Sequence, residues 1–265
     1  MYRWLIAGLL MLATGDVQAE TLRLYAAGSL KAALTEVVQA FEAEQGGALK
    51  VEPTFGASGL LRERIEAGEG AHVFASADMG HPRRLVEQGR AVAPVHIFAR
   101  NRLCALAREG LRVGTDDLLE RMLDATVLLG TSTPKADPSG DYAYALFARA
   151  EALKPGAKAA LEAKALQLTG GPASPKAPDG RNLYAWTMTS GQADLFLTYC
   201  TNAVLAKADV PALSIVAIAP SLAVGADYGL VLVRDAPAAA GTLLTFIRSA
   251  KAQTILARYG FGAGD

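Results

Sequence analysis

Short apolar strands alternate with amphipathic helices along most of the chain, and this alternation limits the possible folds more than any single motif does. A strand pattern at 21–27 precedes one helical face over 30–41, and a second strand at 49–55 precedes a helix over 60–68. A third strand follows at 73–78. Strands separated by crossover helices pair in parallel, with helices over the sheet. The sequence therefore predicts an α/β fold.

The same order of elements begins again in the second half of the chain. A chain of 265 residues has room for about two domains. The tail is helical over 238–259 with a break near Ser249, and the other expected elements are strands at 125–130, 194–199, 213–219 and 229–234 and a helix at 142–153. We therefore expect two units of similar construction.

Residues 1–19 have the pattern of a secretory signal sequence. Arg3 supplies a positive start, an apolar run of ten residues follows at 4–13, and Val17 and Ala19 place small residues before a cleavage point. Ten helical residues cover only about half of a ~30 Å hydrocarbon layer, which favours a removed signal over a membrane anchor. We expect export, to a bacterial periplasm.

Charge and cysteine content exclude several classes of protein. The chain has 26 basic and 26 acidic residues, whereas a nucleic-acid protein needs an excess of Lys and Arg on one face. Two cysteines are too few for a disulfide scaffold or a Cys-rich zinc site. In an oxidising compartment Cys104 and Cys200 could pair, but the sequence leaves open whether they meet.

Three serines share one design, a small hydroxyl residue between a strand and the start of a helix. They are Ser29 after Gly28, Ser58 before Gly59, and Ser139 before Gly140. A helix N-terminus exposes unpaired N–H donors with a partial positive charge, so it attracts anions. A single serine of this kind is typical of an ordinary helix cap. Three of them favour an anion site at the carboxyl ends of the strands, with capping as the open alternative.

Motifs for catalysis are absent from the sequence. The segment 56–60 lacks the final glycine of a nucleophile elbow, and His72, His81 and His96 show no metal-binding spacing. No pair of carboxylates stands out for acid–base chemistry. We therefore predict neither an enzyme nor a site where protein side chains hold a metal.

Two further residues are candidate ligand contacts. Arg181 follows a loop rich in Gly and Pro over 170–180 and could donate charged hydrogen bonds to an anion, or point into solvent. Tyr199 ends a strand, and its hydroxyl could enter a cleft or pack on the core. The sequence does not choose between these alternatives.

Taken in order, the motifs resemble those of the periplasmic molybdate-binding proteins of ABC importers. The similarity lies in Tyr25–Leu30, Phe55–Leu60 followed by 65–68, Val73–Asp78, Asp137–Ala143 and the tail over 252–262, and covers essentially the whole chain after the signal.

This resemblance implies a type II periplasmic binding protein, with two α/β lobes joined by two crossover strands. The lobes would be residues 20–100 plus 229–265, and 101–228. The implied ligand is a tetrahedral oxyanion such as molybdate or tungstate, held by Ser29, Ser58, Ser139, Arg181 and Tyr199 without a cofactor. The implied partner is a membrane permease, and the chain would act as a monomer. Open alternatives are a different small anion or an organic solute on the same fold, or an exported enzyme.

Overall fold

The structure is a computed structural model that describes residues 19–265. The predicted signal sequence, residues 1–19, lies outside the described residues except for Ala19. Within residues 19–265, no helix combines the length and the apolar character needed to cross a membrane.

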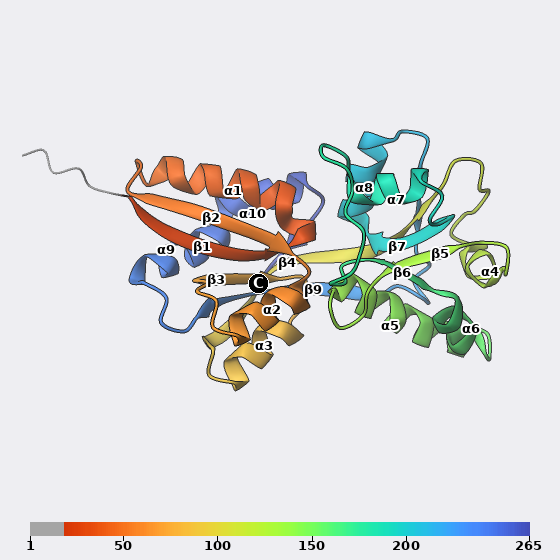
Figure 1. Cartoon of the computed structure of the whole chain (residues 1–265), viewed down its shortest axis with the longest axis horizontal. Coiled ribbons are helices and arrows are strands. Elements are labelled where there is room, and N and C mark those ends of the chain that lie inside the picture. Colours follow the sequence, from red (N-terminus) through yellow and green to blue (C-terminus); the bar gives the residue numbers. More distant parts are fainter. Residues whose placement is uncertain (1–18) are drawn as a thin grey trace, which may run out of the picture.

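Strands and helices alternate as the sequence predicts (Figure 1). In chain order the elements are β1 (Glu20–Ala27), the 3-10 helix η1 (Gly28–Leu30), α1 (Lys31–Glu44), β2 (Leu49–Gly56), α2 (Ser58–Glu66), β3 (Val73–Ser76), α3 (Gly80–Glu87), β4 (Ala91–Ala107), α4 (Leu118–Leu123), β5 (Leu129–Ser132), α5 (Pro138–Leu153), α6 (Ala157–Lys164), β6 (Leu166–Thr169), α7 (Leu183–Thr189), β7 (Leu195–Tyr199), α8 (Cys200–Asp209), β8 (Ser214–Ala217), β9 (Gly225–Val233), α9 (Ala238–Ile247), α10 (Ala250–Arg258) and β10 (Gly262–Ala263).

Two expected strands differ from the observed ones in position, and the helix expected at 142–153 begins earlier, at Pro138. The strand expected at 125–130 lies at Leu129–Ser132, and the strand expected at 229–234 begins at Gly225. The bounds of both strands depend on the strands with which they pair, and these partners lie far away in the chain. A local sequence pattern carries no information on such partners. The break expected near Ser249 is confirmed, since the Ser249 hydroxyl caps α10 by accepting the Ala252 N–H.

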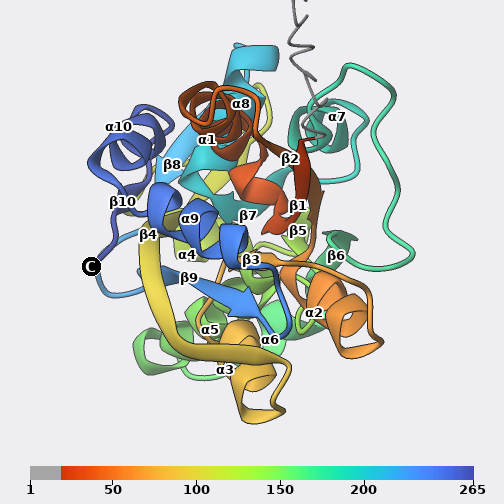
Figure 2. The same ribbon diagram turned by 90° about the vertical axis from the view of Figure 1, so that its left-hand side faces the viewer.

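The first sheet has the order β2-β1-β3-β9-β4. β1 is parallel to β2 and β3, whereas β9 is antiparallel to both β3 and β4. α1 packs with α9 and α10, and α2 packs with α3. These two groups of helices lie on opposite faces of the sheet (Figures 1 and 2). The carboxyl ends of β1, β2 and β3 therefore share one edge, which is where ligands bind in open α/β sheets.

β4 connects the first sheet to a second one. Its residues 91–102 pair with β9, and its residues 103–107 pair with β7 and, over 104–107, with β8. Beyond β7 the second sheet continues with β5 and β6, which are parallel to each other. The chain returns to the first sheet at β9. We propose that the lobes divide at this change of partners; the division expected at 100/101 and 228/229 likewise remains a proposal.

Aromatic side chains connect the two sheets near the crossover. Tyr199 of β7 lies 5.5 Å from Tyr228 of β9 between ring centroids, and Tyr228 lies 5.5 Å from Phe261. Tyr142 of α5 extends this row, 6.2 Å from Tyr199. Such pairs contribute about 0.5–1.5 kcal/mol each beyond the area that they bury. The core is therefore continuous from one lobe to the other.

Candidate functional site

A cavity of about 650 Å³ lies between the two lobes. The first lobe supplies the strand ends at Ala27, Gly56 and Ala77, together with the helix starts that follow β1 and β2. The second lobe supplies Asp137 before α5, Thr169 and Gly170 after β6, residues 181–184 around the start of α7, and Tyr199 at the end of β7. The walls therefore combine strand ends and helix starts from both lobes, and this size is typical of a small-molecule site.

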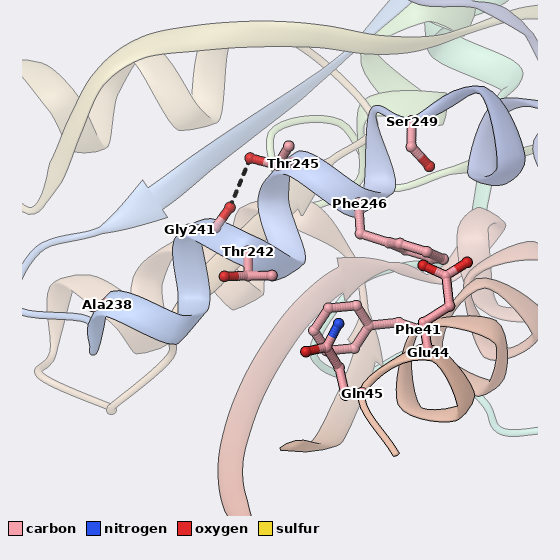
Figure 3. A pocket seen from close by; sticks show the side chains of 9 residues that line it. All are labelled: Phe41, Glu44, Gln45, Ala238, Gly241, Thr242, Thr245, Phe246 and Ser249. Carbon is pink, nitrogen blue, oxygen red and sulfur yellow. Dashed lines mark hydrogen bonds between the residues drawn. The ribbon is translucent and has the colours of Figure 1, made fainter. Parts of the chain in front are cut away.

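A second cavity, of about 660 Å³, lies between α1 and α9 on the first lobe alone (Figure 3). Two of its polar side chains already have partners, since Glu44 accepts from Lys251 and the Thr245 hydroxyl donates to the Gly241 carbonyl. The interlobe cavity, which draws convergent polar groups from both lobes, is the better candidate for a ligand site.

Ser29 lines the cavity, and a hydrogen-bond chain from the buried Tyr228 and the half-buried Asn101 reaches it. The Asn101 amide donates to the Tyr228 hydroxyl at 3.2 Å, and the Tyr228 and Ser29 oxygens are 2.9 Å apart. Either oxygen of the Tyr228–Ser29 pair can be the donor, so the Tyr228 hydroxyl, which accepts from the amide, can donate in turn to Ser29. With Tyr228 as the donor, the Ser29 hydroxyl proton is available to a ligand in the cavity.

Ser58 and Tyr199 meet at one residue, Ala77. The Ser58 oxygen, on a side chain only 1% exposed, accepts the Ala77 N–H at 3.1 Å. The Tyr199 hydroxyl donates to the Ala77 carbonyl at 3.1 Å. Both side chains line the cavity. Since Ser58 uses its oxygen as an acceptor, its proton is free for a ligand, whereas the Tyr199 proton holds the second lobe to the first. Burial raises the pKa of Tyr199 well above its usual value, so the hydroxyl stays protonated.

Asp137, which the sequence analysis did not select, lies on the cavity wall, whereas Ser139 does not line it. The Asp137 carboxylate caps α5 by accepting the Ser139 N–H at 3.0 Å. The buried Ser139 hydroxyl has no hydrogen-bond partner among the described residues. At this third junction, capping by Asp137 takes the helix-start N–H that an anion would otherwise use. Ser139 as a ligand contact stays a prediction.

Burial raises the pKa of Asp137 to about 6, and the negative charge of Asp141 adds to the effect. Because the folded-state pKa exceeds the usual value, the ionised carboxylate destabilises the fold, and this cost develops as the pH rises from about 4 to 6. Asp137→Asn should therefore raise the free energy of unfolding at about pH 7.5 by roughly 1–3 kcal/mol. The gain should vanish near pH 4 in urea unfolding curves. A gain that is the same at both pH values would contradict this assignment.

Arg181 stands at the rim of the cavity. Its side chain is 43% exposed, and its Nε lies 3.4 Å from a carboxylate oxygen of Asp209 in α8. It thus contacts both the cavity and solvent. Lys31, the first residue of α1, is a second exposed cation at the rim. The two cations lie on different lobes, so an anion between the lobes is attracted from both sides.

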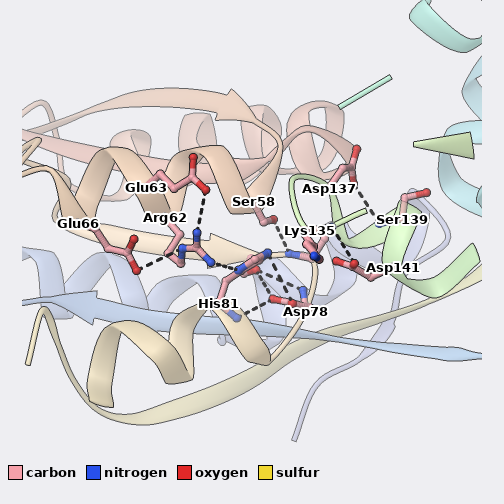
Figure 4. A network of polar contacts seen from close by, with 12 residues as sticks. Ser58, Arg62, Glu63, Glu66, Asp78, His81, Lys135, Asp137, Ser139 and Asp141 are labelled. Atoms are coloured by element: carbon pink, nitrogen blue, oxygen red, sulfur yellow. Dashed lines mark hydrogen bonds and ion pairs between the residues drawn. The ribbon is translucent and has the colours of Figure 1, made fainter. Parts of the chain in front are cut away.

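Direct contacts join the lobes beside the cavity (Figure 4). The Gly59 N–H in α2 donates to the Ala136 carbonyl at 2.8 Å. In Figure 4, Lys135, Asp137 and Asp141 of the second lobe face Ser58, Arg62 and His81 of the first. Arg62 donates to His81 Nδ1 at 3.3 Å, and burial lowers the pKa of His81. The start of α2 is therefore both a wall of the cavity and a contact surface for the other lobe.

The sequence analysis did not select three of these residues, Asn101, Asp137 and Tyr228, as candidate contacts. Tyr228 and Asn101 reach the cavity only through Ser29, which is 199 residues away from Tyr228 in the chain. Asp137 belongs to a segment that the motif comparison did include, and its position before Pro138 is typical of a helix cap. Its place on the cavity wall depends on Gly170, which approaches it from β6.

Cys104 and Cys200 form a disulfide, with Cα atoms 4.8 Å apart. This bond ties β4 to the start of α8, directly after Tyr199. Within residues 19–265 there is no cluster of three or more His, Cys, Asp or Glu side chains that could hold a metal ion.

Two α/β lobes around a polar cavity define the class of two-lobed solute-binding proteins. The chain belongs to the family of bacterial extracellular solute-binding proteins, whose family model matches residues 22–262. An uncharacterised protein of Pasteurella multocida is 41% identical over 182 residues, which are 68% of this chain and 74% of that protein.

Solved structures with the same fold include the periplasmic molybdate-binding protein of Azotobacter vinelandii, with a TM-score of 0.71 and 20% identity over 91% of this chain and 98% of that one. The sulfate-binding protein SubI of Mycobacterium tuberculosis has a TM-score of 0.72 and 18% identity, over 92% of this chain and 87% of that one. Identities this low show the fold alone, and they confirm the predicted type II periplasmic binding protein architecture.

Proposed function

We propose that this chain is the periplasmic solute-binding component of an ABC importer and holds a small tetrahedral oxyanion between its lobes. The observation that carries this proposal is the pair of hydroxyl groups, on Ser29 and Ser58, that line the cavity at two helix starts and can each donate to an anion. The structural relatives are named for molybdate and sulfate, and the motif resemblance adds tungstate. These three anions, together with phosphate as a fourth tetrahedral oxyanion, form the group of candidate ligands.

In this proposal the protein performs no bond chemistry and needs no cofactor. The ligand enters while the lobes are apart and the lobes close on it by a hinge at the crossover strands. The closed monomer then docks on a membrane permease. Ser29 and Ser58 donate to the anion, Lys31 and Arg181 attract it at the rim, and Tyr199 holds the lobes together. Ser139 is retained among the proposed contacts through its unpartnered hydroxyl.

Isothermal titration calorimetry with molybdate, tungstate, sulfate and phosphate tests the ligand class. We expect saturable binding of at least one of the four with one site per monomer. Absence of heat with all four would refute the oxyanion proposal.

The cavity volume favours a second candidate, an organic anion. About 650 Å³ corresponds to roughly twenty water molecules at about 30 Å³ each, which exceeds the space that one tetrahedral oxyanion fills. Phe55, Leu183 and Leu205 add apolar wall. Native mass spectrometry of freshly purified protein distinguishes the candidates, because an organic ligand adds a mass that no inorganic oxyanion explains.

Ser58→Ala should weaken oxyanion binding by about 1–3 kcal/mol, or roughly 5- to 150-fold, because it removes a donor to the ligand and leaves the Ala77 N–H unpaired. Calorimetry with the best ligand of the group measures the effect. Ser190→Ala is the matched control, since Ser190 is exposed and bonds only to carbonyls of α7 and to Gln192. Equal affinities for the two variants would remove Ser58 from the site.

A further inference from the structure

We propose that Asp137 makes this cavity selective for oxyanions that carry their own O–H donor, of which hydrogen phosphate is the simplest, over oxyanions without a proton. This inference rests on the proposed function and narrows its ligand class.

The Asp137 carboxylate accepts hydrogen bonds from its own lobe and keeps acceptor capacity for a ligand in the cavity. Oδ1 accepts the Ser139 N–H at the start of α5. A side-chain hydrogen bond from Ser132 also reaches the carboxylate, and two carboxylate oxygens together can accept about four hydrogen bonds. Gly170 borders the carboxylate so closely that a Cβ on that residue would lie 2.4 Å from Oδ2. The absence of a side chain at Gly170 therefore leaves room for an acceptor on the cavity wall.

The donors and acceptors on the wall define the ligand that fits. Ser29 and Ser58 each have a proton to donate, whereas Asp137 can only accept while it is ionised. Sulfate, molybdate and tungstate carry no proton at neutral pH, so they offer acceptors alone and are repelled by the carboxylate. Phosphate keeps a proton at neutral pH, and its O–H can donate to Oδ2 while its other oxygens accept from the serines. A phosphate monoester in its singly protonated form has the same chemistry.

The ionisable side chains of α5, α7, β7 and β9 around Asp137 are negative or neutral, so the Asp137 carboxylate can accept a hydrogen bond from a ligand. Asp141 on α5 is negative, while Tyr184 on α7, Tyr199 on β7 and Tyr228 on β9 have pKa values raised by burial and stay neutral. The cations Lys31 and Arg181 stand at the rim, and Arg181 pairs with Asp209. With a pKa of about 6, Asp137 is ionised at neutral pH and becomes neutral in mild acid. Sulfate should therefore bind better as the pH falls below 6.

Calorimetry with inorganic phosphate and with sodium sulfate, two tetrahedral anions of similar size, tests this selectivity. At about pH 7.5 we expect the native protein to prefer phosphate by at least tenfold, or about 1.4 kcal/mol. Asp137→Asn should bring this ratio near one or reverse it, because an amide can donate to sulfate. The native protein at about pH 5 should bind sulfate more tightly than at pH 7.5. Asp235→Asn, at an exposed position on the first lobe, is the control and should leave the ratio unchanged.

Three outcomes overturn the inference, and they distinguish its failure from a failure of the proposed function. If phosphate and sulfate bind equally and Asp137→Asn changes neither, the selectivity is wrong while the proposed function stands. Tight binding of molybdate or sulfate at pH 7.5 with no binding of phosphate has the same meaning. No binding of any of the four oxyanions refutes the proposed function and this inference with it. If the Asn variant does not fold, Asp137→Ser, which keeps a capping oxygen, replaces it.

Discussion

Replacing both Cys104 and Cys200 by alanine should lower the free energy of unfolding by about 4 kcal/mol. The disulfide closes a loop of 96 residues, and loops near 100 residues are worth up to about 4.7 kcal/mol in the chain-entropy model. For a chain of this size the loss corresponds to a midpoint lower by roughly 10 °C. The bond joins β4 to the residue after Tyr199, so the region that loses its tether includes a wall of the cavity.

Differential scanning calorimetry of the native protein and the double variant, each with and without dithiothreitol, measures this effect. Reduction should move the native protein to the midpoint of the variant and leave the variant unchanged. This comparison separates the effect of the covalent bond on the unfolding midpoint from the effect of the smaller alanine side chains. A native protein whose midpoint does not respond to reduction, with thiol labelling showing the bond to be open, would refute the stabilising role.

The parts of the site that follow a local pattern could be predicted from the sequence. Ser29 and Ser58 stand between a strand and a helix, and the carboxyl ends of parallel strands share an edge, so both serines were placed on the wall by the order of elements alone. Tyr199 was recognised for the same reason, as the last residue of a strand. The sequence left open whether the Tyr199 side chain enters the cavity or packs in the core. In the structure it does both, since it is buried and also lines the cavity.

The parts that depend on long-range pairing could not be predicted. β4 was not recognised, although it is a strand of 17 residues, because Pro94 and the polar residues at 100–102 interrupt the apolar alternation on which the prediction relied. Without β4, the sequence does not show that Asn101 and Tyr228 meet behind Ser29. The disulfide was undecided for the same reason, since Cys104 reaches Cys200 only through the register of β4 with β7.

The helix start at Ser139 differs from the other two, although Ser139 itself stays a predicted ligand contact. All three junctions offer a hydroxyl at a helix start, but only the third is preceded by an aspartate that reaches back to the helix. The Asp137 carboxylate supplies the negative charge that the start of α5 favours. At this helix start a side chain of the protein therefore occupies the position that an anion would take. A side chain two residues away therefore decides whether such a junction is available to a ligand.

Gly59→Ala should reduce ligand affinity by roughly 5- to 150-fold. In this structure a Cβ at Gly59 would lie 2.3 Å from the Lys135 carbonyl oxygen and 2.7 Å from that of Ala136. Both are backbone atoms of the opposite lobe, so neither moves aside as a flexible side chain would. Overpacking of this kind costs about 1–3 kcal/mol, and the lobes can avoid the cost only by staying apart. The variant should therefore favour an open form while each lobe keeps its own packing.

Two measurements on Gly59→Ala separate lobe closure from folding. Calorimetry with the best-binding oxyanion gives the loss of affinity, and small-angle X-ray scattering shows whether the ligand still makes the molecule more compact. The control is Gly241→Ala in α9, where a Cβ meets no atom within 4 Å and alanine favours the helix by up to about 1 kcal/mol. We expect the control to bind and contract like the native protein, and Gly59→Ala to do neither while unfolding at a similar temperature without ligand. If Gly59→Ala binds with native affinity and contracts on ligand addition, the contact between α2 and the Lys135–Ala136 backbone is not part of the closed state. The hydroxyl groups of Ser29 and Ser58 would then have to hold the anion without that contact between the lobes.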